Sequence, residues 1–135
     1  MIPAVTPRRV GRLVTIVVAA GALVAACGGG SSGSSSSYKQ PKGPAQTTVD
    51  ITGGNFFFDP KSPEAPAGVD AIKLSSQSGL HTLVFAGGKV PGFKLQASSG
   101  NSDTLKVDLK PGNYEFYCDI PGHREAGMDG TLTVH

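Results

Sequence analysis

Four residues of types that bind soft metal ions stand out in this chain: His81, Cys118, His123 and Met128. The last three lie in one stretch, with four residues separating the cysteine from the histidine and four separating the histidine from the methionine. One thiolate, two imidazoles and one thioether are the donor set of a mononuclear blue-copper site, which carries single electrons. The spacing therefore predicts one copper ion, cycling between Cu(I) and Cu(II), held by these four side chains.

The scarcity of these residue types supports the prediction. The chain has two cysteines and two methionines, and only Cys118 and Met128 fall outside its N-terminal segment. Taken singly, each residue has a simpler reading: Cys118 as a small buried hydrophobe, His81 as an ordinary strand histidine, Met128 as a filler of a gap in the core. Taken together, and at this spacing, they favour a metal site.

Other metal chemistries fit less well. Zinc accepts a cysteine and two histidines, but a thioether is a poor zinc ligand. A binuclear copper centre needs a second nearby cysteine, and a copper oxidase or nitrite reductase needs further histidines. Only His135 is left over, and we expect it to be an exposed, frayed C-terminal end. A single copper ion remains the best fit.

The elements that must position these residues are strands. Apolar and polar residues alternate in several short runs, as expected for half-buried strands, and no stretch shows helical periodicity. Glycine and proline turns separate the runs, for example at Pro66–Gly68 and Pro111–Gly112. Short strands at regular spacing predict an all-β sandwich over residues 46–135.

The same alternation predicts where two of the metal-binding residues point. His81 shares a strand face with Leu83, and Cys118 shares one with Phe116, because residues two apart in a strand lie on the same side. Leu83 and Phe116 are expected in the core. His81 and Cys118 should therefore point inward at the ends of two apolar strands and be able to meet.

Residues 1–26 are interpreted as a lipoprotein signal peptide. Arginines at positions 8, 9 and 12 precede an apolar run over residues 13–26. A run of this length is typical of a signal-peptide core and is shorter than the roughly 20 residues that span a membrane. Small residues and then Cys27 end the run, so we expect Cys27 to be lipidated and to begin the mature protein. The alternatives are ordinary cleavage, which leaves Cys27 a free thiol, and a twin-arginine export signal at the first two arginines.

Residues 27–45 are predicted to form a flexible tether. Their first part is almost entirely glycine and serine, a composition that cannot bury apolar surface and behaves as a coil. Such a segment would hold a folded domain near a membrane without fixing its orientation. Export would permit a disulfide between Cys27 and Cys118, but each cysteine has a stronger explanation of its own.

Processing changes the charge of the chain. The formal net charge is +2, and loss of the three arginines with the signal peptide takes it to about −1. No basic patch then remains that would point to nucleic acid as a partner. A net charge near zero also predicts little electrostatic steering toward any partner.

With these residues in view, the chain resembles the cupredoxins, the plastocyanin/azurin family of type 1 blue-copper proteins, over nearly all of residues 46–135. The loop that follows Cys118 is similar in length to that of rusticyanin and auracyanin. The resemblance rests on five segments: Pro66–Gly68, Gly79–Leu83, Pro111–Cys118, Pro121–His123 and Gly127–Leu132.

The resemblance implies a Greek-key sandwich of about eight strands with copper near one end. It implies His81, Cys118 and His123 as the strong trigonal ligands and Met128 as the weak axial ligand. It also implies that the edge of His123 reaches the surface and carries the electron. Many members have asparagine after the first histidine, whereas this chain has Thr82, whose hydroxyl could make part of the same link between the ligand segments.

Hydrogen bonds to the thiolate should tune the site. We expect the backbone N–H groups of Thr82 and Ile120 to reach the sulfur of Cys118. The N–H of Ile120 is available because the proline of this loop comes one position later, at Pro121. Such bonds withdraw electron density from the thiolate and raise the reduction potential.

These features predict an electron carrier rather than an enzyme. We expect a monomeric, extracytoplasmic blue-copper protein, anchored to the cell membrane through lipidated Cys27, with redox proteins docking near His123. The alternative is a module that buffers or delivers copper, although the chain lacks the Met- or His-rich tracts of open delivery sites. A domain working within a larger oxidase or reductase complex is a third possibility.

Overall fold

The computed structural model describes residues 37–135; the predicted signal peptide, Cys27 and most of the glycine–serine run lie outside them. Within the described residues, the only helical element is one short 3-10 turn, η1 (Ala86–Gly88), and no helix is long and apolar enough to cross a bilayer. The strands, in chain order, are β1 (Thr48–Gly54), β2 (Phe57–Asp59), β3 (Glu64–Ala65), β4 (Gly68–Ser76), β5 (His81–Phe85), β6 (Leu95–Ala97), β7 (Ser102–Leu109), β8 (Gly112–Tyr117) and β9 (Asp129–Val134).

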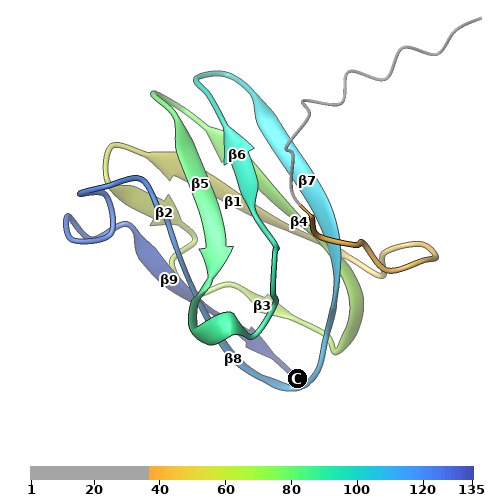
Figure 1. The fold of residues 1–135 in the computed structure, drawn as a ribbon. Coiled ribbons are helices and arrows are strands. Elements are labelled where there is room, and N and C mark those ends of the chain that lie inside the picture. The colour runs from red at the N-terminus through yellow and green to blue at the C-terminus, as the bar shows by residue number, and fades with distance from the viewer. Residues whose placement is uncertain (1–36) are drawn as a thin grey trace, which may run out of the picture. The chain divides into compact units, whose positions relative to one another are not determined.

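The strands form two sheets packed face to face (Figure 1). One sheet has the order β2-β1-β4-β7 and the other the order β3-β9-β8-β5-β6. The pairs β1–β4 and β3–β9 are parallel, and the other pairs are antiparallel. The all-β sandwich is confirmed. The described residues form nine strands where about eight were expected, and two of them, β2 and β3, have only three and two residues.

Alternation along each strand builds the core between the sheets. In β4, Ile72 and Leu74 are fully buried, whereas Lys73 between them points outward. The apolar face that results drives the two sheets together. In the second sheet, Leu83 of β5 and Phe116 of β8 are also fully buried.

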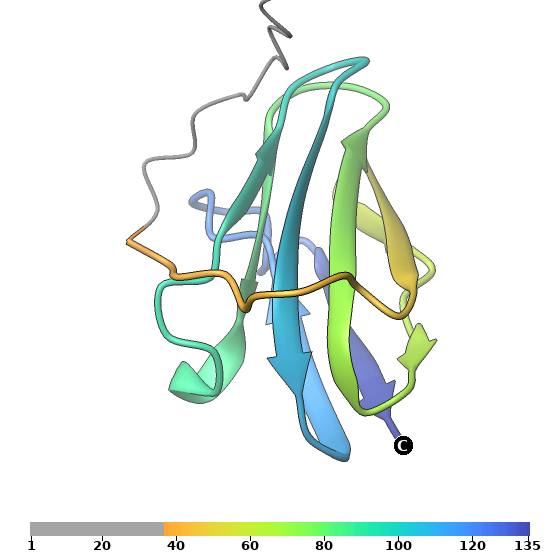
Figure 2. The same cartoon turned by 90° about the vertical axis from the view of Figure 1, so that its right-hand side faces the viewer.

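The N-terminal part of the described chain lies along the outside of the sandwich. The ring of Tyr38 packs edge-on against Phe93, with centroids 5.2 Å apart. The side chain of Gln40 accepts a hydrogen bond from the backbone N–H of Lys106, and the Lys106 ammonium donates to the carbonyl of Gly43. Figure 2 shows this segment, in orange, crossing in front of β7 and β4. The end of the predicted tether thus contacts the domain.

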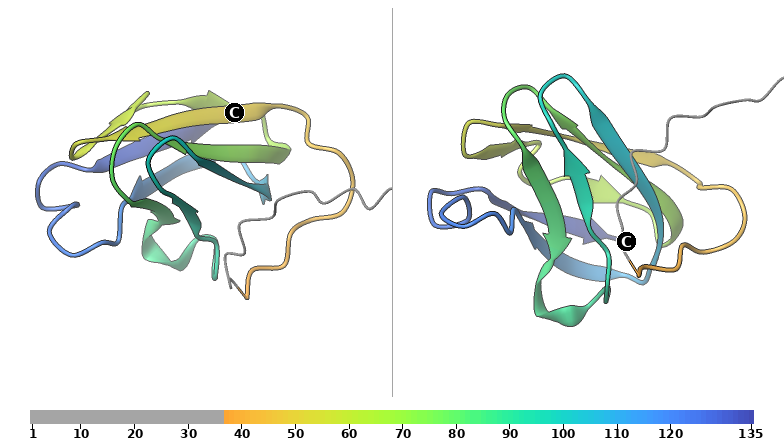
Figure 3. Two further views of the ribbon diagram at one scale, coloured as in Figure 1. Left: turned by 90° about the horizontal axis from the view of Figure 1, so that it is seen from above. Right: turned by 45° about the horizontal axis from the view of Figure 1, so that its top comes forward.

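One end of the sandwich gathers the loops that carry the metal-binding residues. The turn between β1 and β2 and the loop between β8 and β9 lie side by side there, as both views of Figure 3 show. The ring of Phe56 in the first loop contacts the ring of His123 in the second, with centroids 5.1 Å apart. The C-terminus lies at the other end of the sandwich (Figure 1).

Candidate metal centre

The candidate site forms where β5 begins and β8 ends. These strands are antiparallel neighbours, with Val84 opposite Tyr117. His81 is the first residue of β5, and Cys118 directly follows β8. Because the strands run in opposite directions, the start of one meets the end of the other, which brings His81 and Cys118 together as strand alternation predicts.

Three potential ligand atoms converge at this point. One atom each from His81, Cys118 and His123 lies within 4.8 Å of the other two. His81 and Cys118 are buried and His123 is partly exposed. The sulfur of Cys118 lies 3.5 Å from Nδ1 of His123, and the two imidazole rings are 5.4 Å apart between centroids. The three side chains can therefore share one ion.

The orientation of His81 shows which of its nitrogens faces the site. Its Nε2 lies 2.7 Å from the carbonyl of Ser78, a distance at which an N–H donates to that oxygen. Its Nδ1 is buried and has no hydrogen-bond partner among residues 37–135. A buried acceptor without a partner is costly, and a metal ion would satisfy it.

The charge state of His81 also suits a metal ligand. Burial lowers the pKa of this imidazole, and the nearby His123 lowers it further, while the Ser78 carbonyl opposes part of the change. The imidazole is therefore neutral at neutral pH, and only the neutral form has a lone pair to give to a metal.

Met128 completes the cluster through the backbone. Its side chain is fully buried, its N–H donates to the carbonyl of His123, and its own carbonyl accepts from the N–H of Cys118. A Cβ placed on Gly53 would lie 3.2 Å from both the His81 ring and the Met128 methyl group. The absence of a side chain at Gly53 therefore leaves room for the two side chains to meet.

The sulfur of Cys118 accepts one of the two hydrogen bonds expected from the sequence. The backbone N–H of Thr82 donates to it at 3.4 Å. The prediction of a second bond, from Ile120, is wrong: among the described residues the N–H of Ile120 makes no bond to the sulfur. The carbonyl of Ile120 accepts a hydrogen bond from the N–H of His123. The loop turns at this point, so the backbone of Ile120 serves the turn rather than the sulfur.

The hydroxyl of Thr82 links the two ligand segments, as its position predicts. It donates to the Asp119 carboxylate at 2.6 Å and accepts from the Asp119 backbone N–H at 3.0 Å. The other carboxylate oxygen of Asp119 bonds Lys94 at 2.8 Å. Burial would raise the pKa of Asp119, but the bonds from Lys94 and Thr82 outweigh burial, so this pKa is lowered and the group is ionised.

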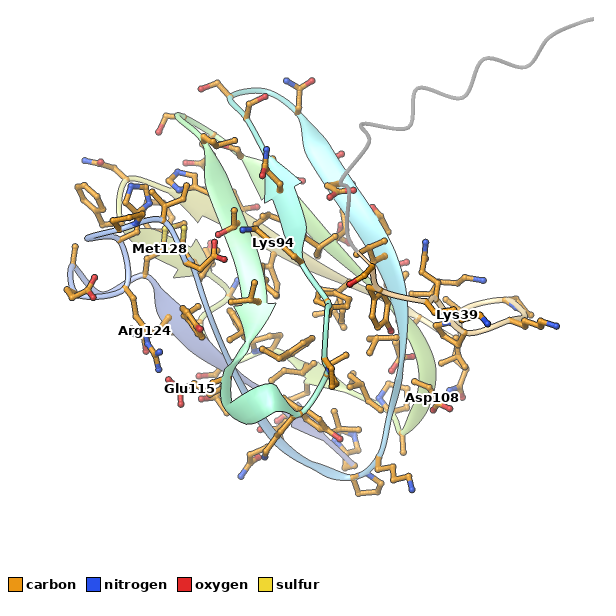
Figure 4. The ribbon with its side chains drawn as sticks, in the orientation of Figure 1. Lys39, Lys94, Asp108, Glu115, Arg124 and Met128 are labelled. Carbon is orange, nitrogen blue, oxygen red and sulfur yellow. The ribbon has the colours of Figure 1, made fainter. Side chains whose placement is uncertain are left out.

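The loop between His123 and Met128 is fastened from outside. The guanidinium of Arg124 lies 4.0 Å from the centre of the Tyr117 ring and forms a 2.6 Å ion pair with Glu115 of β8. Figure 4 shows Arg124 and Glu115 beside one another below Met128. Because Glu115 and Tyr117 belong to β8, these contacts attach the loop to that strand.

A shallow hollow opens beside His123. Its wall includes Asn55, Ser78, Gly79 and His81 with the apolar side chains of Phe56, Leu80 and Ile120. Phe56 and Leu80 are 43% and 46% exposed, high values for large apolar residues. Phe56 also has a positive φ of 62°, which is strained for a bulky residue, and such strain is concentrated at functional sites.

Two further residues stand out in the sequence, Cys27 and His135. Cys27 falls outside the described residues. His135 is exposed, as expected, but it is not frayed: its N–H donates to the carbonyl of Ala65, and its carbonyl accepts from Ala67. Sequence reasoning missed Gly53, Ser78 and Lys94, whose roles depend on contacts between distant segments.

A thiol, two imidazoles and a neighbouring thioether, in a buried pocket at one end of a β-sandwich, define a protein built to hold a soft transition metal. The comparisons with known proteins agree. A family model described as copper binding proteins, plastocyanin/azurin family, matches residues 35–135. The chain therefore belongs to the plastocyanin/azurin family, and its cofactor is a single copper ion.

The similar curated proteins are plastocyanins. That of Physcomitrium patens is 33% identical over 97 residues, which cover 64% of this chain and 56% of the relative. That of Pisum sativum is 37% identical over 81 residues, which cover 60% of this chain and 37% of the relative. That of Nostoc punctiforme is 30% identical over 102 residues, 66% and 72% of the two chains. The match thus spans little more than half of the first relative and less of the second.

Solved structures show the same fold. Auracyanin B has a TM-score of 0.61 at 23% identity, covering 74% of this chain and 96% of its own. Dithionite-reduced auracyanin from Roseiflexus castenholzii has a TM-score of 0.57 at 25% identity, covering 68% and 99%. Both auracyanins thus share the fold of the whole sandwich.

Proposed function

We propose that this protein is a membrane-tethered blue-copper carrier that passes single electrons between extracytoplasmic redox partners. Nδ1 of His81, the sulfur of Cys118 and Nδ1 of His123 would hold the copper, and the thioether of Met128 would be a fourth, weaker ligand. The observation that carries the proposal is the convergence of the three strong donors within 4.8 Å, with the buried Nδ1 of His81 lacking any protein partner within the described residues.

Electron transfer suits the burial of this cluster. Cys118 and Met128 are fully buried and His81 is nearly so, which leaves little room for a substrate to bind the metal. Copper with a thiolate and a thioether favours the exchange of one electron, because these ligands stabilise Cu(I) while the imidazoles suit both states. The protein would therefore act as a carrier and not as a catalyst.

His123 is the proposed exit for the electron. It is partly exposed, whereas His81 is buried, so His123 is the ligand that a partner can approach. The hollow beside His123, with the exposed side chains of Phe56 and Leu80, would form an apolar docking surface. Apolar exposed surface of this kind typically marks an interaction site, and we propose redox proteins as its partners.

Lipidated Cys27 would hold the carrier at the cell membrane. Small residues and then this cysteine end the apolar N-terminal run, which supports processing at this position. One acyl chain binds membranes only marginally, so firm anchoring requires more than one chain on the processed cysteine. Mass spectrometry of the native protein should show an acylated N-terminus at Cys27; an unmodified soluble form beginning elsewhere would refute the anchor.

Absorption spectroscopy and voltammetry test the carrier. The copper-loaded protein should be intensely blue and should exchange one electron reversibly. The variant Met128→Gln should retain copper and colour with a lower potential, because the weak thioether ligand would tune the metal more than hold it. A copper protein that is colourless, or that loses its metal on each reduction, would instead indicate copper storage or delivery.

A further inference from the structure

A row of three polar side chains leads from the protein surface to the sulfur of Cys118. Lys94 bonds one oxygen of Asp119 at 2.8 Å, and the Thr82 hydroxyl bonds the other at 2.6 Å. The oxygen of that hydroxyl lies 3.5 Å from the sulfur. Figure 4 shows Lys94 extending toward β5, the strand that carries Thr82.

The hydroxyl of Thr82 has one proton and two possible recipients. At 2.6 Å the bond to Asp119 has the short length of a charge-assisted hydrogen bond, whereas the contact with the sulfur is long. The same oxygen accepts the backbone N–H of Asp119 at 3.0 Å. The proton therefore lies on the Asp119 side, and the hydroxyl presents a lone pair, not a donor, to the sulfur.

Asp119 also brings a negative charge close to the sulfur. Its side chain is about one-third exposed and that of Lys94 is 40% exposed, so water weakens the pair without removing its field. Lys94 offsets part of the charge and fixes the carboxylate beneath the Thr82 hydroxyl. The other described ion pairs involve different residues, and that of Asp50 with Lys73 lies on the first sheet, on the outer face of β1 and β4.

We propose that Asp119 is a positioning residue that lowers the reduction potential of the copper site, by withholding the Thr82 hydroxyl proton from the Cys118 sulfur and by its own charge. Lys94 sets how far the potential falls. The proposal rests on the proposed function, because it concerns the potential of a copper site that Cys118 helps to form.

Two effects of Asp119 act in the same direction. A hydrogen bond to a thiolate favours Cu(I), so a hydroxyl that is diverted elsewhere leaves Cu(II) relatively more stable. A nearby negative charge likewise favours the more positive oxidised site. The backbone N–H of Thr82 still donates to the sulfur.

Voltammetry of charge variants gives the first test. Asp119→Asn should raise the potential by about 59 mV, a tenfold shift in the ratio of oxidised to reduced protein. Lys94→Gln should lower the potential by a smaller amount, because the unpaired carboxylate then accepts the Thr82 proton more strongly. Lys94→Arg keeps the positive charge and should leave the potential near the native value. Asp50→Asn and Lys73→Gln remove the same charges far from the site and should leave the potential unchanged. A potential that does not rise in Asp119→Asn overturns the proposal.

Thr82→Val separates the two possible hydrogen-bond arrangements. Valine keeps the shape of threonine and removes the hydroxyl. If the hydroxyl donates to Asp119, its loss takes no donor from the sulfur and the potential does not fall. Asp119→Asn should then raise the potential less in the valine background than in the native protein. A fall of the potential in Thr82→Val would show that the hydroxyl donates to the sulfur, and would refute the proposal.

A measurement without copper checks the contact itself. In the metal-free protein, the unfolding equilibrium constants of Thr82→Val, Asp119→Asn and the double variant should be non-additive by about fivefold or more, because the two residues share a hydrogen bond. Additive effects would overturn the proposal. Failure of the proposed function would look different: the native protein itself would bind no copper or would be colourless.

Discussion

The two ends of the sandwich treat buried polar atoms in opposite ways. At the copper end, the unpartnered Nδ1 of His81 lies beside Cys118 and His123, which supply further donors to a shared metal. Toward the other end, the two carboxylate oxygens of Asp70 on β4 are also buried without a hydrogen-bond partner in the described chain. The difference shows that an unsatisfied buried atom becomes a site only when other donors converge on it.

Asp70 is a buried polar group without neighbouring metal-binding side chains among the described residues. Its residue is fully buried on the core-facing side of β4, opposite Val107 of β7. Burial raises its pKa, and the nearby backbone N–H of Thr47, which does not reach full hydrogen-bonding geometry, opposes only part of that rise. Burial thus favours the neutral form of both groups, but only the neutral imidazole of His81 gains a lone pair that can bind a metal.

The largest effect should come from removing one of the three donor atoms that meet at the copper end. Cys118→Ser removes the thiolate and with it the intense blue absorption, because that colour arises from charge transfer between sulfur and copper. Cys27→Ser is the matched control. The copper-loaded variant should keep the blue colour, but the protein should no longer be held at membranes. An intact blue band in Cys118→Ser would contradict the ligand assignment.

The second effect concerns the other end. Asp70→Asn removes the buried charge and should stabilise the protein by about 1–2 kcal/mol at pH 7. Because the folded-state pKa of Asp70 is raised, the stabilising proton is fully bound below the ordinary value of 3.8, and its contribution is lost as the pH rises through the folded-state pKa.

Urea unfolding at several pH values measures this effect. The native protein should lose stability over that pH range, and Asp70→Asn should lose less. The exposed Asp50 offers a control, since Asp50→Asn should change neither the stability at pH 7 nor its pH dependence by much. Equal pH profiles for the native protein and Asp70→Asn would show that the buried carboxyl is satisfied in solution.

A smaller effect is expected from crowding the copper end. In Gly53→Ala the added methyl would lie 3.2 Å from both the His81 ring and the Met128 methyl group, closer than ordinary contacts allow. We expect a loss of about 1 kcal/mol in stability, with altered copper spectra. Calorimetry of the copper-free and copper-loaded forms separates strain in the fold from strain at the metal. Unchanged spectra would mean that the two side chains move aside freely.

The smallest effect is expected at Ile120. Its N–H does not reach the sulfur, so Ile120→Pro removes no hydrogen bond from the thiolate and should leave the potential nearly unchanged. Voltammetry on the two proteins decides this, with Asp119→Asn as the positive control. A clear fall of the potential would restore Ile120 as a donor.

Alternation along the strands was enough to predict the sandwich and the meeting of His81 with Cys118, because burial fixes which face of a strand points inward. It also contained the signal for Asp70, which shares a face with Ile72 and Leu74. The sequence could not show that Ser78 orients His81 or that Lys94 reaches Asp119. Those contacts depend on how loops from different strands meet, which no local pattern encodes.

The contacts of Arg124 with Glu115 and Tyr117 have a consequence for the rate of electron transfer. A loop that is attached to β8 by an ion pair and a ring contact has less freedom to change shape when the charge of the metal changes. The proposed ligands on either side of it, His123 and Met128, would then hold nearly the same positions in both oxidation states. Little atomic rearrangement would accompany each transfer, so the barrier to transfer would be set mainly by the distance and driving force between the copper and its partner.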